Sequence, residues 1–570
     1  QALRLIKNRF VSSFKGIYID PPYNTSASEI LYKNSFRHSS WMSLIASRIP
    51  IGRSLLSPSG VHCLTIDDVE YTKVKEILDE SFGEDLYLGT TVIKNNPSGR
   101  STASGFSIAH EYGIFHANSD NVKIGRLERT QAQKDRYKEK DNIGYYEWVN
   151  FRKHGGTKEE SPSMFYPIYV NTVQDTFRLP NLDWDDVNKI WIELEQPETD
   201  EIRVLPVDDK RIERRWKWGI DRFKNSANEF CVRQDKNGNK TVYLKARMND
   251  EGMLPLTIWD KKEYSATSYG TNLLKDLFGD IGAFSYPKSI HAVEDSLRVM
   301  NVGDGDWVLD YFAGSGTTAH AAVNLNRLDS KCRKFCLIEQ GQYFDTATKP
   351  RVIKSHFSSE WKNGIPKNTN GIIGIIKVIK LESYEDTLNN ISLSKKNADL
   401  FDLMSSQVAE DYLLKYMLGE ESKSSLLNTD NFRKPFSYEM DIATDSAGAT
   451  ERKSIDLVET FNFLIGLHVK SIESNIERGY VRVEGTLPSG ERTLILWRDC
   501  DKIGYEKLND YANRFDLYAK EQTFDVIYIN GDHNLPTAFT VDGDDGEVLR
   551  SLKLRQIEPE FLSLMFAEEI

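Results

Sequence analysis

The chain has 570 residues, of which 39% are hydrophobic and 28% charged, and its formal net charge is −12. At about 150 residues per domain, this length predicts three or four domains with ample core. The acidic balance excludes a globally basic nucleic-acid binder but not local basic patches. No apolar run approaches the roughly 20 residues that cross a bilayer, so no membrane partner is expected.

The cysteine pattern and the start of the chain give two further expectations. Five cysteines are scattered without a Cys-x-x-Cys pair, which favours reduced thiols over a zinc site, so no metal is expected. No signal peptide is visible, and the chain opens inside a predicted helix, so we expect that residues precede Gln1.

Residues 1–120 are predicted to alternate between strands and helices, which is typical of a mostly parallel α/β sheet. We expect this segment to be the catalytic half of one domain. The expected strands cover residues 17–19, 60–66 and 108–116, and the expected helices cover 40–56 and 67–82, the second capped by Asp67 or Asp68.

The first of these strands runs into the turn Asp20-Pro21-Pro22-Tyr23. Proline has no N–H, so the two prolines end the strand and present their neighbours at its carboxyl edge, where open α/β sheets bind ligands. Asp20 and the Pro21 carbonyl could accept the two hydrogens of an exocyclic amine, while Tyr23 stacks on the ring that carries it. Taken alone, the turn is equally compatible with an ordinary loop and a surface acid.

Between residues 121 and 265 the periodicity is lost, and basic and aromatic residues are interleaved. Residues 121–158 carry ten Lys or Arg against five Asp or Glu, residues 208–247 carry twelve against six, and the acidic stretch 183–201 lies between them. Two such basic segments predict a DNA-binding face, although a solvated surface is the simpler interpretation of any single residue. The candidate contacts are Arg152, Lys153, Arg211, Arg214, Arg215, Lys217 and Arg222.

The α/β pattern returns in residues 266–380, where strands are expected at 306–310 and 334–339, with a helix over 319–326 between them. Gly314 and Gly316 allow the backbone to approach a ligand at the helix N-terminus. Glu339 follows about 23 residues later, the spacing of an acid that binds ribose hydroxyls. The turn lacks the Gly-Lys-Ser/Thr ending, which disfavours a nucleoside triphosphate.

Residues 381–570 are predicted to form a C-terminal α/β module that makes dimer or partner contacts. This segment contains no second glycine-rich turn, no nuclease-like cluster and no helicase motif. The expected strands cover 480–483, 493–497 and 524–529, and the expected helices cover 397–418 and 505–519.

The order of these features resembles the β-class amino-methyltransferases of DNA. Asp20–Tyr23 matches their catalytic motif, 312–316 (Phe-Ala-Gly-Ser-Gly) their cofactor motif, and 284–288 (Phe-Ser-Tyr-Pro-Lys) the segment that covers the methionine end of the cofactor. The chain further resembles the modification (Mod) subunits of type III restriction–modification systems, whose members extend upstream of the segment matching Gln1. This second resemblance rests on residues 20–25, 165–170, 381–386 and 459–468.

The resemblance implies a doubly wound, Rossmann-like methyltransferase sheet with a large inserted target-recognition domain. It implies site-specific transfer of methyl from S-adenosylmethionine to N6 of an adenine flipped out of double-stranded DNA. It also implies a homodimer in the prokaryotic cytoplasm that recruits a separate restriction subunit with ATPase and nuclease activity. The catalytic residues would be Asp20, Pro21, Pro22 and Tyr23, and the cofactor residues Asp310, Phe312, Ala313, Gly314, Ser315, Gly316, Glu339 and Lys288.

Two other interpretations remain open from the sequence. The chain could methylate RNA or another planar amine, which an assay on duplex DNA against RNA would separate. It could also be a DNA-binding scaffold or an NAD-type dehydrogenase that uses Gly314, Gly316 and Ala319. Titration with S-adenosylmethionine against NAD would decide that case.

Overall fold

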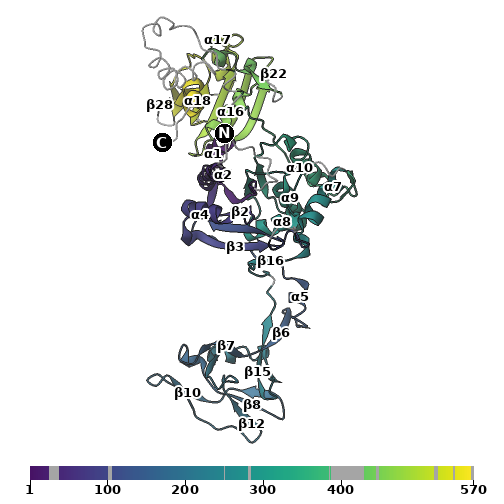
Figure 1. The fold of residues 1–570 in the computed structure, drawn as a ribbon. Coiled ribbons are helices and arrows are strands. Elements are labelled where there is room, and N and C mark those ends of the chain that lie inside the picture. The colour runs from purple at the N-terminus through teal and green to yellow at the C-terminus, as the bar shows by residue number, and fades with distance from the viewer. Residues whose placement is uncertain are drawn as a thin grey trace, which may run out of the picture. The chain divides into compact units, whose positions relative to one another are not determined.

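The computed structural model divides the chain into two compact units, residues 1–125 with 256–570 and residues 126–255 (Figure 1). The second unit lies within the segment 121–265 in which the sequence loses its periodicity. The helix expected at 397–418, Thr25 and part of 381–386 fall outside the described residues. The described residues are 1–24, 37–99, 105–249, 251–279, 284–383, 386, 390, 429–444, 449–515, 517–518, 524–543, 546–551 and 553–565.

A seven-stranded sheet organises the first unit, in the order β16-β3-β4-β2-β1-β17-β18. Its pairings are parallel except that β4 runs antiparallel to both of its neighbours. The strands are β1 (Phe14–Ile19), β2 (Leu56–Ile66), β3 (Tyr87–Ile93), β4 (Glu111–Ala117), β16 (Ile258–Trp259), β17 (Trp307–Asp310) and β18 (Lys334–Leu337).

The sheet grows in both directions from β1, which is its topological switch point. In parallel register, Ile17 pairs with His62 of β2 on one side and with Leu309 of β17 on the other. Because ligands of open α/β sheets bind outside the carboxyl ends of the strands at such a point, the segments that follow β1 and β17 share one binding edge. Those segments are the Asp-Pro-Pro-Tyr turn and the glycine-rich turn.

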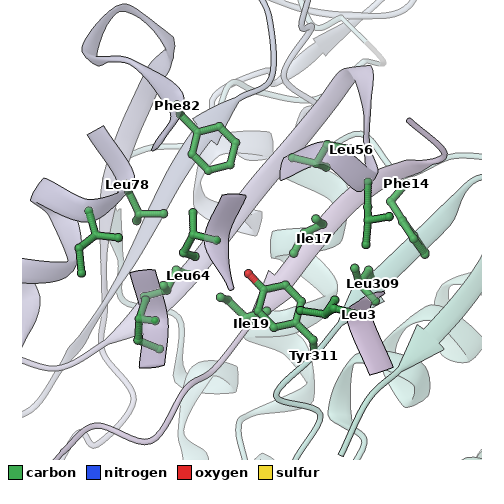
Figure 2. Packing of buried hydrophobic residues seen from close by; sticks show 14 of the residues in the cluster. Leu3, Phe14, Ile17, Ile19, Leu56, Leu64, Leu78, Phe82, Leu309 and Tyr311 are labelled. Carbon is green, nitrogen blue, oxygen red and sulfur yellow. The ribbon is translucent and has the colours of Figure 1, made fainter. Parts of the chain in front are cut away.

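Helices cover both faces of the sheet. Alternate residues of β1 point to opposite faces, so their neighbours show what packs on each side. Ile17 and Ile19 are buried in a core cluster with side chains of α1 to α4 (Figure 2). On the other face, a Cβ at Gly16 would lie 3.0 Å from Val302, which follows α8. The fold is therefore a doubly wound α/β sheet. The helices are α1 (Ala2–Phe10), α2 (Arg37–Ala46), α3 (Ile49–Leu55), α4 (Tyr71–Phe82), α7 (Asn272–Phe278), α8 (Ile290–Val299), α9 (Thr317–Asp329) and α10 (Thr348–Phe357).

Two expectations for the helices need correction. The single helix expected over 40–56 is two helices, α2 and α3, and Pro50 lies in the first turn of α3, where its missing N–H costs nothing. The prediction that Asp67 or Asp68 caps the next helix is wrong, because α4 begins at Tyr71 after Glu70. Asp67 instead accepts a hydrogen bond from the Val69 N–H at 3.1 Å.

The unit 126–255 is built from short antiparallel sheets around an aromatic core. Phe151, Trp216 and Phe223 are buried there, and the Phe151 and Trp216 rings stack at 5.0 Å. Its strands are β5 (Glu139–Lys140), β6 (Tyr145–Asn150), β7 (Arg152–Thr157), β8 (Ile168–Asn171), β9 (Thr176–Arg178), β10 (Leu182–Asp185), β11 (Ile190–Glu193), β12 (Glu201–Val204), β13 (Arg214–Trp216), β14 (Phe230–Gln234) and β15 (Lys240–Arg247), with helices α5 (Gln131–Lys134) and α6 (Ile220–Lys224).

The C-terminal part of the first unit contains a five-stranded sheet in the order β23-β24-β25-β26-β29. Two buried clusters pack on it, one with α16 and α18 and the other with α17. The elements are α15 (Thr429–Arg433), β21 (Glu439–Ala443), β22 (Thr450–Ser454), α16 (Leu457–Leu464), β23 (His468–Asn475), β24 (Tyr480–Thr486), β25 (Arg492–Arg498), α17 (Tyr505–Arg514), β26 (Val526–Ile529), β27 (Ala538–Gly543), β28 (Gly546–Ser551), β29 (Lys553–Gln556) and α18 (Ile557–Met565); the hairpin β19 (Trp361–Lys362) and β20 (Ile365–Pro366) precedes them.

Candidate active site

The Asp-Pro-Pro-Tyr turn follows β1 directly and is fixed by a side chain of α2 and by Glu70, which immediately precedes α4. The Trp41 indole N–H donates to the Pro22 carbonyl at 2.7 Å. Asn24 ends the described turn in the left-handed region, at φ 57°, and its amide donates to Glu70 at 2.5 Å. Within the described residues, the Pro21 carbonyl accepts no hydrogen bond, so it is available to an incoming donor.

The Asp20 carboxylate belongs to a cluster of charged and polar side chains at the same edge. Its Oδ1 accepts from Thr65 of β2 at 2.8 Å and lies 3.1 Å from the Lys288 ammonium. The same ammonium lies 2.5 Å from Glu111, the first residue of β4, and also contacts the Tyr23 hydroxyl. The sequence groups Lys288 with the cofactor residues, whereas the structure brings it to Asp20 and Tyr23.

Glu111 is a member of this cluster that the sequence did not indicate as a site residue. Its Oε2 accepts from the Tyr23 hydroxyl at 2.9 Å and from Asn95 at 2.7 Å, in addition to Lys288. The side chain of Glu111 is only 3% exposed. Because β4 runs antiparallel to β2, its first residue lies at the edge where the parallel strands end. The position of Glu111 could therefore be predicted only if the direction of β4 were known.

The protonation states in this cluster follow from burial and from the neighbouring charges. Burial raises the pKa of Asp20, Lys288 opposes this, and Glu111 adds to it. Burial alone would lower the pKa of Lys288, but the two carboxylates outweigh it and the pKa is raised, so the side chain is an ammonium. Burial and the same carboxylates raise the pKa of Tyr23 far above its usual value, so its hydroxyl is protonated and its ring carries no charge.

The glycine-rich turn between β17 and α9 is organised by Asp310. This buried carboxylate accepts from the Phe312 N–H at 3.0 Å and from the Thr318 hydroxyl at 2.5 Å. Burial raises the pKa of Asp310 to about 7. Gly314 and Gly316 have φ values of 50° and 81°, the left-handed region that glycine adopts at little cost. Asp310 thus holds the turn in shape from inside the protein.

Glu339 follows β18 and faces the glycine-rich turn from the next strand. One of its oxygens accepts from the Gly314 N–H at 2.6 Å, and the other accepts from the Tyr343 hydroxyl at 3.0 Å. The Phe284 ring packs edge-on against Tyr343, at 4.8 Å between centroids, and borders Gly314. The turn, the acid and these two aromatic rings therefore form one site. Ala313 and Ser315 are buried within the same turn.

A second residue that the sequence did not indicate, Arg351 of α10, lies under this turn. Its guanidinium is fully buried and donates to the hydroxyls of Ser315 at 2.6 Å and Thr317 at 2.8 Å. One terminal nitrogen of the group has no hydrogen-bond partner within the described residues. Burial lowers the pKa of Arg351. A buried cation behind the turn favours an anionic group on its open side.

The seven basic residues predicted to contact DNA fall into two groups in the structure. Lys153, Arg211 and Arg222 are exposed, and the Arg222 guanidinium lies 3.9 Å from the centre of the Trp218 ring. The other four bond within their own unit. Arg152 donates to the Val207 carbonyl, Arg214 pairs with Asp208 at 2.8 Å, Arg215 contacts the Met164 sulfur at 3.3 Å, and Lys217 donates to the Asn150 carbonyl at 2.5 Å.

No group of three or more His, Cys, Asp or Glu side chains among the described residues is arranged to hold a metal ion. None of their helices has both the length and the apolar character needed to span a membrane.

The doubly wound sheet and the two turns at its switch point are typical of an α/β transferase. The chain belongs to the DNA methylase family: the family model N6_N4_Mtase, described as DNA methylase, matches residues 14–349. It is therefore an S-adenosylmethionine-dependent DNA methyltransferase of the class that modifies exocyclic amines.

The relatives of the chain include type II methyltransferases and type III restriction-modification Mod subunits. It is 30% identical over 391 residues to the type II methyltransferase M.KpnI of Klebsiella pneumoniae, covering 66% of this chain and 84% of that protein. It is 29% identical over 382 residues to the type III restriction-modification enzyme EcoPI Mod subunit of Escherichia phage P1, covering 60% of this chain and 56% of that subunit. The chain thus spans little more than half of that Mod subunit. The solved structure of the M1.HpyAVI–SAM complex is similar at 13% identity and a TM-score of 0.27, over 60% of this chain and 89% of that one.

Proposed function

We propose that this chain methylates N6 of adenine in double-stranded DNA and serves as the recognition subunit of a type III restriction–modification complex. One observation carries the catalytic part of the proposal. The Asp20 turn and the glycine-rich turn follow adjacent strands, β1 and β17, at the same edge of the sheet. The acid-led form of the turn favours adenine, as does the similarity to Mod subunits.

The residues of the first turn are suited to orient an amine that is a poor nucleophile. The nitrogen lone pair of N6 is delocalised into the adenine ring. The Asp20 carboxylate would accept one N–H of the amine and the Pro21 carbonyl the other. These two hydrogen bonds would draw the lone pair out of conjugation with the ring. The carboxylate would also stabilise the positive charge that develops on the nitrogen during transfer.

Tyr23 would hold the target base outside the duplex. Flipping a base costs a few kcal/mol, and stacking on an aromatic ring contributes roughly 1–3 kcal/mol. The Tyr23 hydroxyl is bonded to Glu111 at 2.9 Å, so the ring is already oriented before a base arrives. Most of the rate gain would then come from alignment of the base with the methyl donor.

The second turn has the donors and acceptors that S-adenosylmethionine requires. When bound, the cofactor supplies an electrophilic methyl group. The Glu339 carboxylate can accept the ribose hydroxyls, the left-handed glycines leave room for close approach to the backbone, and Arg351 places positive charge behind Ser315. Phe284 and Tyr343 would cover the bound molecule. Asp310 would keep the turn in shape without touching the ligand.

The unit 126–255 would recognise DNA, with Lys153, Arg211 and Arg222 as the phosphate contacts that its surface offers. The bonded group, Arg152, Arg214, Arg215 and Lys217, would support that surface from within. Phosphate contacts fix register and supply affinity, whereas base contacts supply the sequence code.

The proposed complex is a homodimer that binds a separate restriction subunit in the prokaryotic cytoplasm. An exposed apolar surface beside α10 supports the dimer. Ile373 and Ile375 are fully exposed and Phe357 is about half exposed. The Ile372 N–H donates to the His356 carbonyl at 2.9 Å, which holds this segment against the end of α10. Contiguous exposed apolar patches mark protein contacts, and these side chains would form part of such a patch.

The test is transfer of labelled methyl from S-adenosylmethionine to unmethylated duplex DNA, to RNA and to no acceptor. The wild type should label the duplex alone, in N6-methyladenine, at sites that sequencing of the product DNA identifies. Asp20→Ala should abolish transfer while DNA affinity stays near that of the wild type. Label in RNA, label in N4-methylcytosine, or near wild-type transfer by Asp20→Ala would each contradict the proposal. DNA cleavage by the isolated chain with ATP would contradict the division of labour with a restriction subunit.

A further inference from the structure

The Lys288 ammonium joins two carboxylates from strands that are not neighbours in the sheet. Asp20 follows β1 and Glu111 begins β4, and β2 lies between these strands. The ammonium lies 3.1 Å from the first carboxylate and 2.5 Å from the second. One cation therefore serves two carboxylates, of which Glu111 is almost fully buried and Asp20 is about a quarter exposed.

The hydrogen bonds in this cluster leave one Asp20 oxygen for the target amine. Within the described residues, the contacts from Thr65 and Lys288 both fall on Oδ1. A carboxylate has two oxygens, each with two lone pairs, so Oδ2 can accept the incoming N–H. This arrangement lasts only while the ammonium is shared. Without the second carboxylate, Lys288 would pair with Asp20 alone and compete with the amine for it.

The same Glu111 oxygen sets the orientation of the stacking ring. It accepts from the Tyr23 hydroxyl at 2.9 Å and from Asn95 of the loop after β3 at 2.7 Å. The Lys288 ammonium also lies 4.5 Å from the centre of the Tyr23 ring. One buried carboxylate therefore fixes both groups that would hold the base, the acid through Lys288 and the ring directly.

We propose that Glu111 is a positioning residue for methyl transfer, which shares the Lys288 ammonium with Asp20 and orients the Tyr23 ring before the base arrives. The inference rests on the proposed function, because it assigns Glu111 to the transfer at the Asp20 turn. Glu111 does not touch the reacting atoms in this scheme. Its negative charge and its three hydrogen bonds are what the reaction uses.

The experiment compares Glu111→Gln with a matched control, Glu294→Gln. Glu294 is also buried in the first unit, where it bonds to His291 and Asn324 at 3.0 Å, and neither partner belongs to the Asp20 cluster. Glu111→Gln should lower kcat by about 10²-fold, because a small misplacement of reacting groups has that effect. The KM for S-adenosylmethionine should stay within about twofold, and Glu294→Gln should match the wild type in both constants.

A double variant tests whether Glu111 acts through the ammonium. If the two residues work as one unit, Glu111→Gln with Lys288→Met should lose no more activity than the worse single variant. Multiplying losses would show independent roles and overturn the proposal. A wild-type kcat for Glu111→Gln, or equal losses in Glu111→Gln and Glu294→Gln, would overturn it as well.

One fluorescence measurement and one ¹⁹F NMR measurement separate this inference from the proposed function. 2-Aminopurine at the target position brightens when the base leaves the stack, and Glu111→Gln should reduce that emission. 3-Fluorotyrosine at position 23 gives a ¹⁹F signal without DNA or turnover, and Glu111→Gln should move it while Glu294→Gln leaves it in place. An unmoved signal would overturn the positioning of Tyr23. A wild type that moves no methyl to DNA would instead contradict the proposed function.

Discussion

Asp310→Asn should make the stability of the first unit less sensitive to a rise in pH from 5 to 8. The buried carboxyl has a pKa of about 7 in the folded protein, against 3.8 for an ordinary aspartate. Between these values the folded state keeps a proton that the unfolded chain has released, so stability falls as the pH rises. The whole difference corresponds to roughly 4 kcal/mol, fully present below the unfolded pKa and lost above the folded one. Roughly 3 kcal/mol of it lies between pH 5 and pH 8.

Asparagine preserves the shape of the side chain and removes the titration. Its carbonyl can accept from the Phe312 N–H, and its amide can donate to the Thr318 hydroxyl. The free energy of unfolding, measured by urea titration with tryptophan fluorescence, should shift in favour of the variant by roughly 3 kcal/mol between pH 5 and pH 8.

A second buried aspartate provides the control for this measurement. Asp295 is buried in the same unit, and although burial opposes the effect, its bonds to Lys261 and Tyr264 and the charge of Arg298 lower its pKa. It is therefore ionised in both states from pH 5 to pH 8, and the difference between Asp295→Asn and the wild type should not change over that range. If the difference in unfolding free energy between Asp310→Asn and the wild type is also constant from pH 5 to pH 8, the reasoning is refuted.

Three other predictions concern the cofactor, the dimer and DNA. Gly316→Val should weaken S-adenosylmethionine binding, measured by calorimetry, by about tenfold, because a residue with a Cβ in the left-handed conformation costs roughly 1–2 kcal/mol. Equal affinity in a folded variant would place the cofactor elsewhere. Ile373→Asp with Ile375→Asp should change a dimer into a monomer by light scattering, and a monomeric wild type at micromolar concentration would remove the dimer. Arg211→Gln and Arg222→Gln should each reduce the slope of log affinity against log salt by about 0.9, and an unchanged slope would place the DNA face elsewhere.

The central strands and the two turns could be predicted from the sequence because their signals are local. A short apolar run that ends in two prolines, or in a glycine-rich turn before a helix, specifies its own structure. The direction of β4 has no local signal in the sequence, because the hydrophobic pattern of a strand is the same whether the strand runs parallel or antiparallel to its neighbours. Glu111 therefore could not be placed at the edge beside Asp20, nor could Lys288, which lies 268 residues further along the chain than Asp20.

The basic residues of the insert illustrate a second limit of the sequence. Arg152 and Lys153 are adjacent, yet the first donates to a backbone carbonyl within its unit and the second is exposed. Composition identifies a basic segment, but tertiary packing decides which cations remain for phosphate. Arg351 was missed for a related reason, because a buried arginine under a turn has no periodic signature.

The pairing of β1 with β17 makes the order of synthesis important for this protein. Ile17 pairs with Leu309, so on the ribosome β1 must wait for about 290 residues before its partner emerges. Until then it presents an unpaired edge, which is a template for pairing with other chains. Early collapse of residues 126–255 into their own unit would shorten the open loop to about 160 residues and reduce the cost of closing it by about 0.5 kcal/mol. Early folding of the insert would thus remove the closure cost that its own length adds between the two halves of the site.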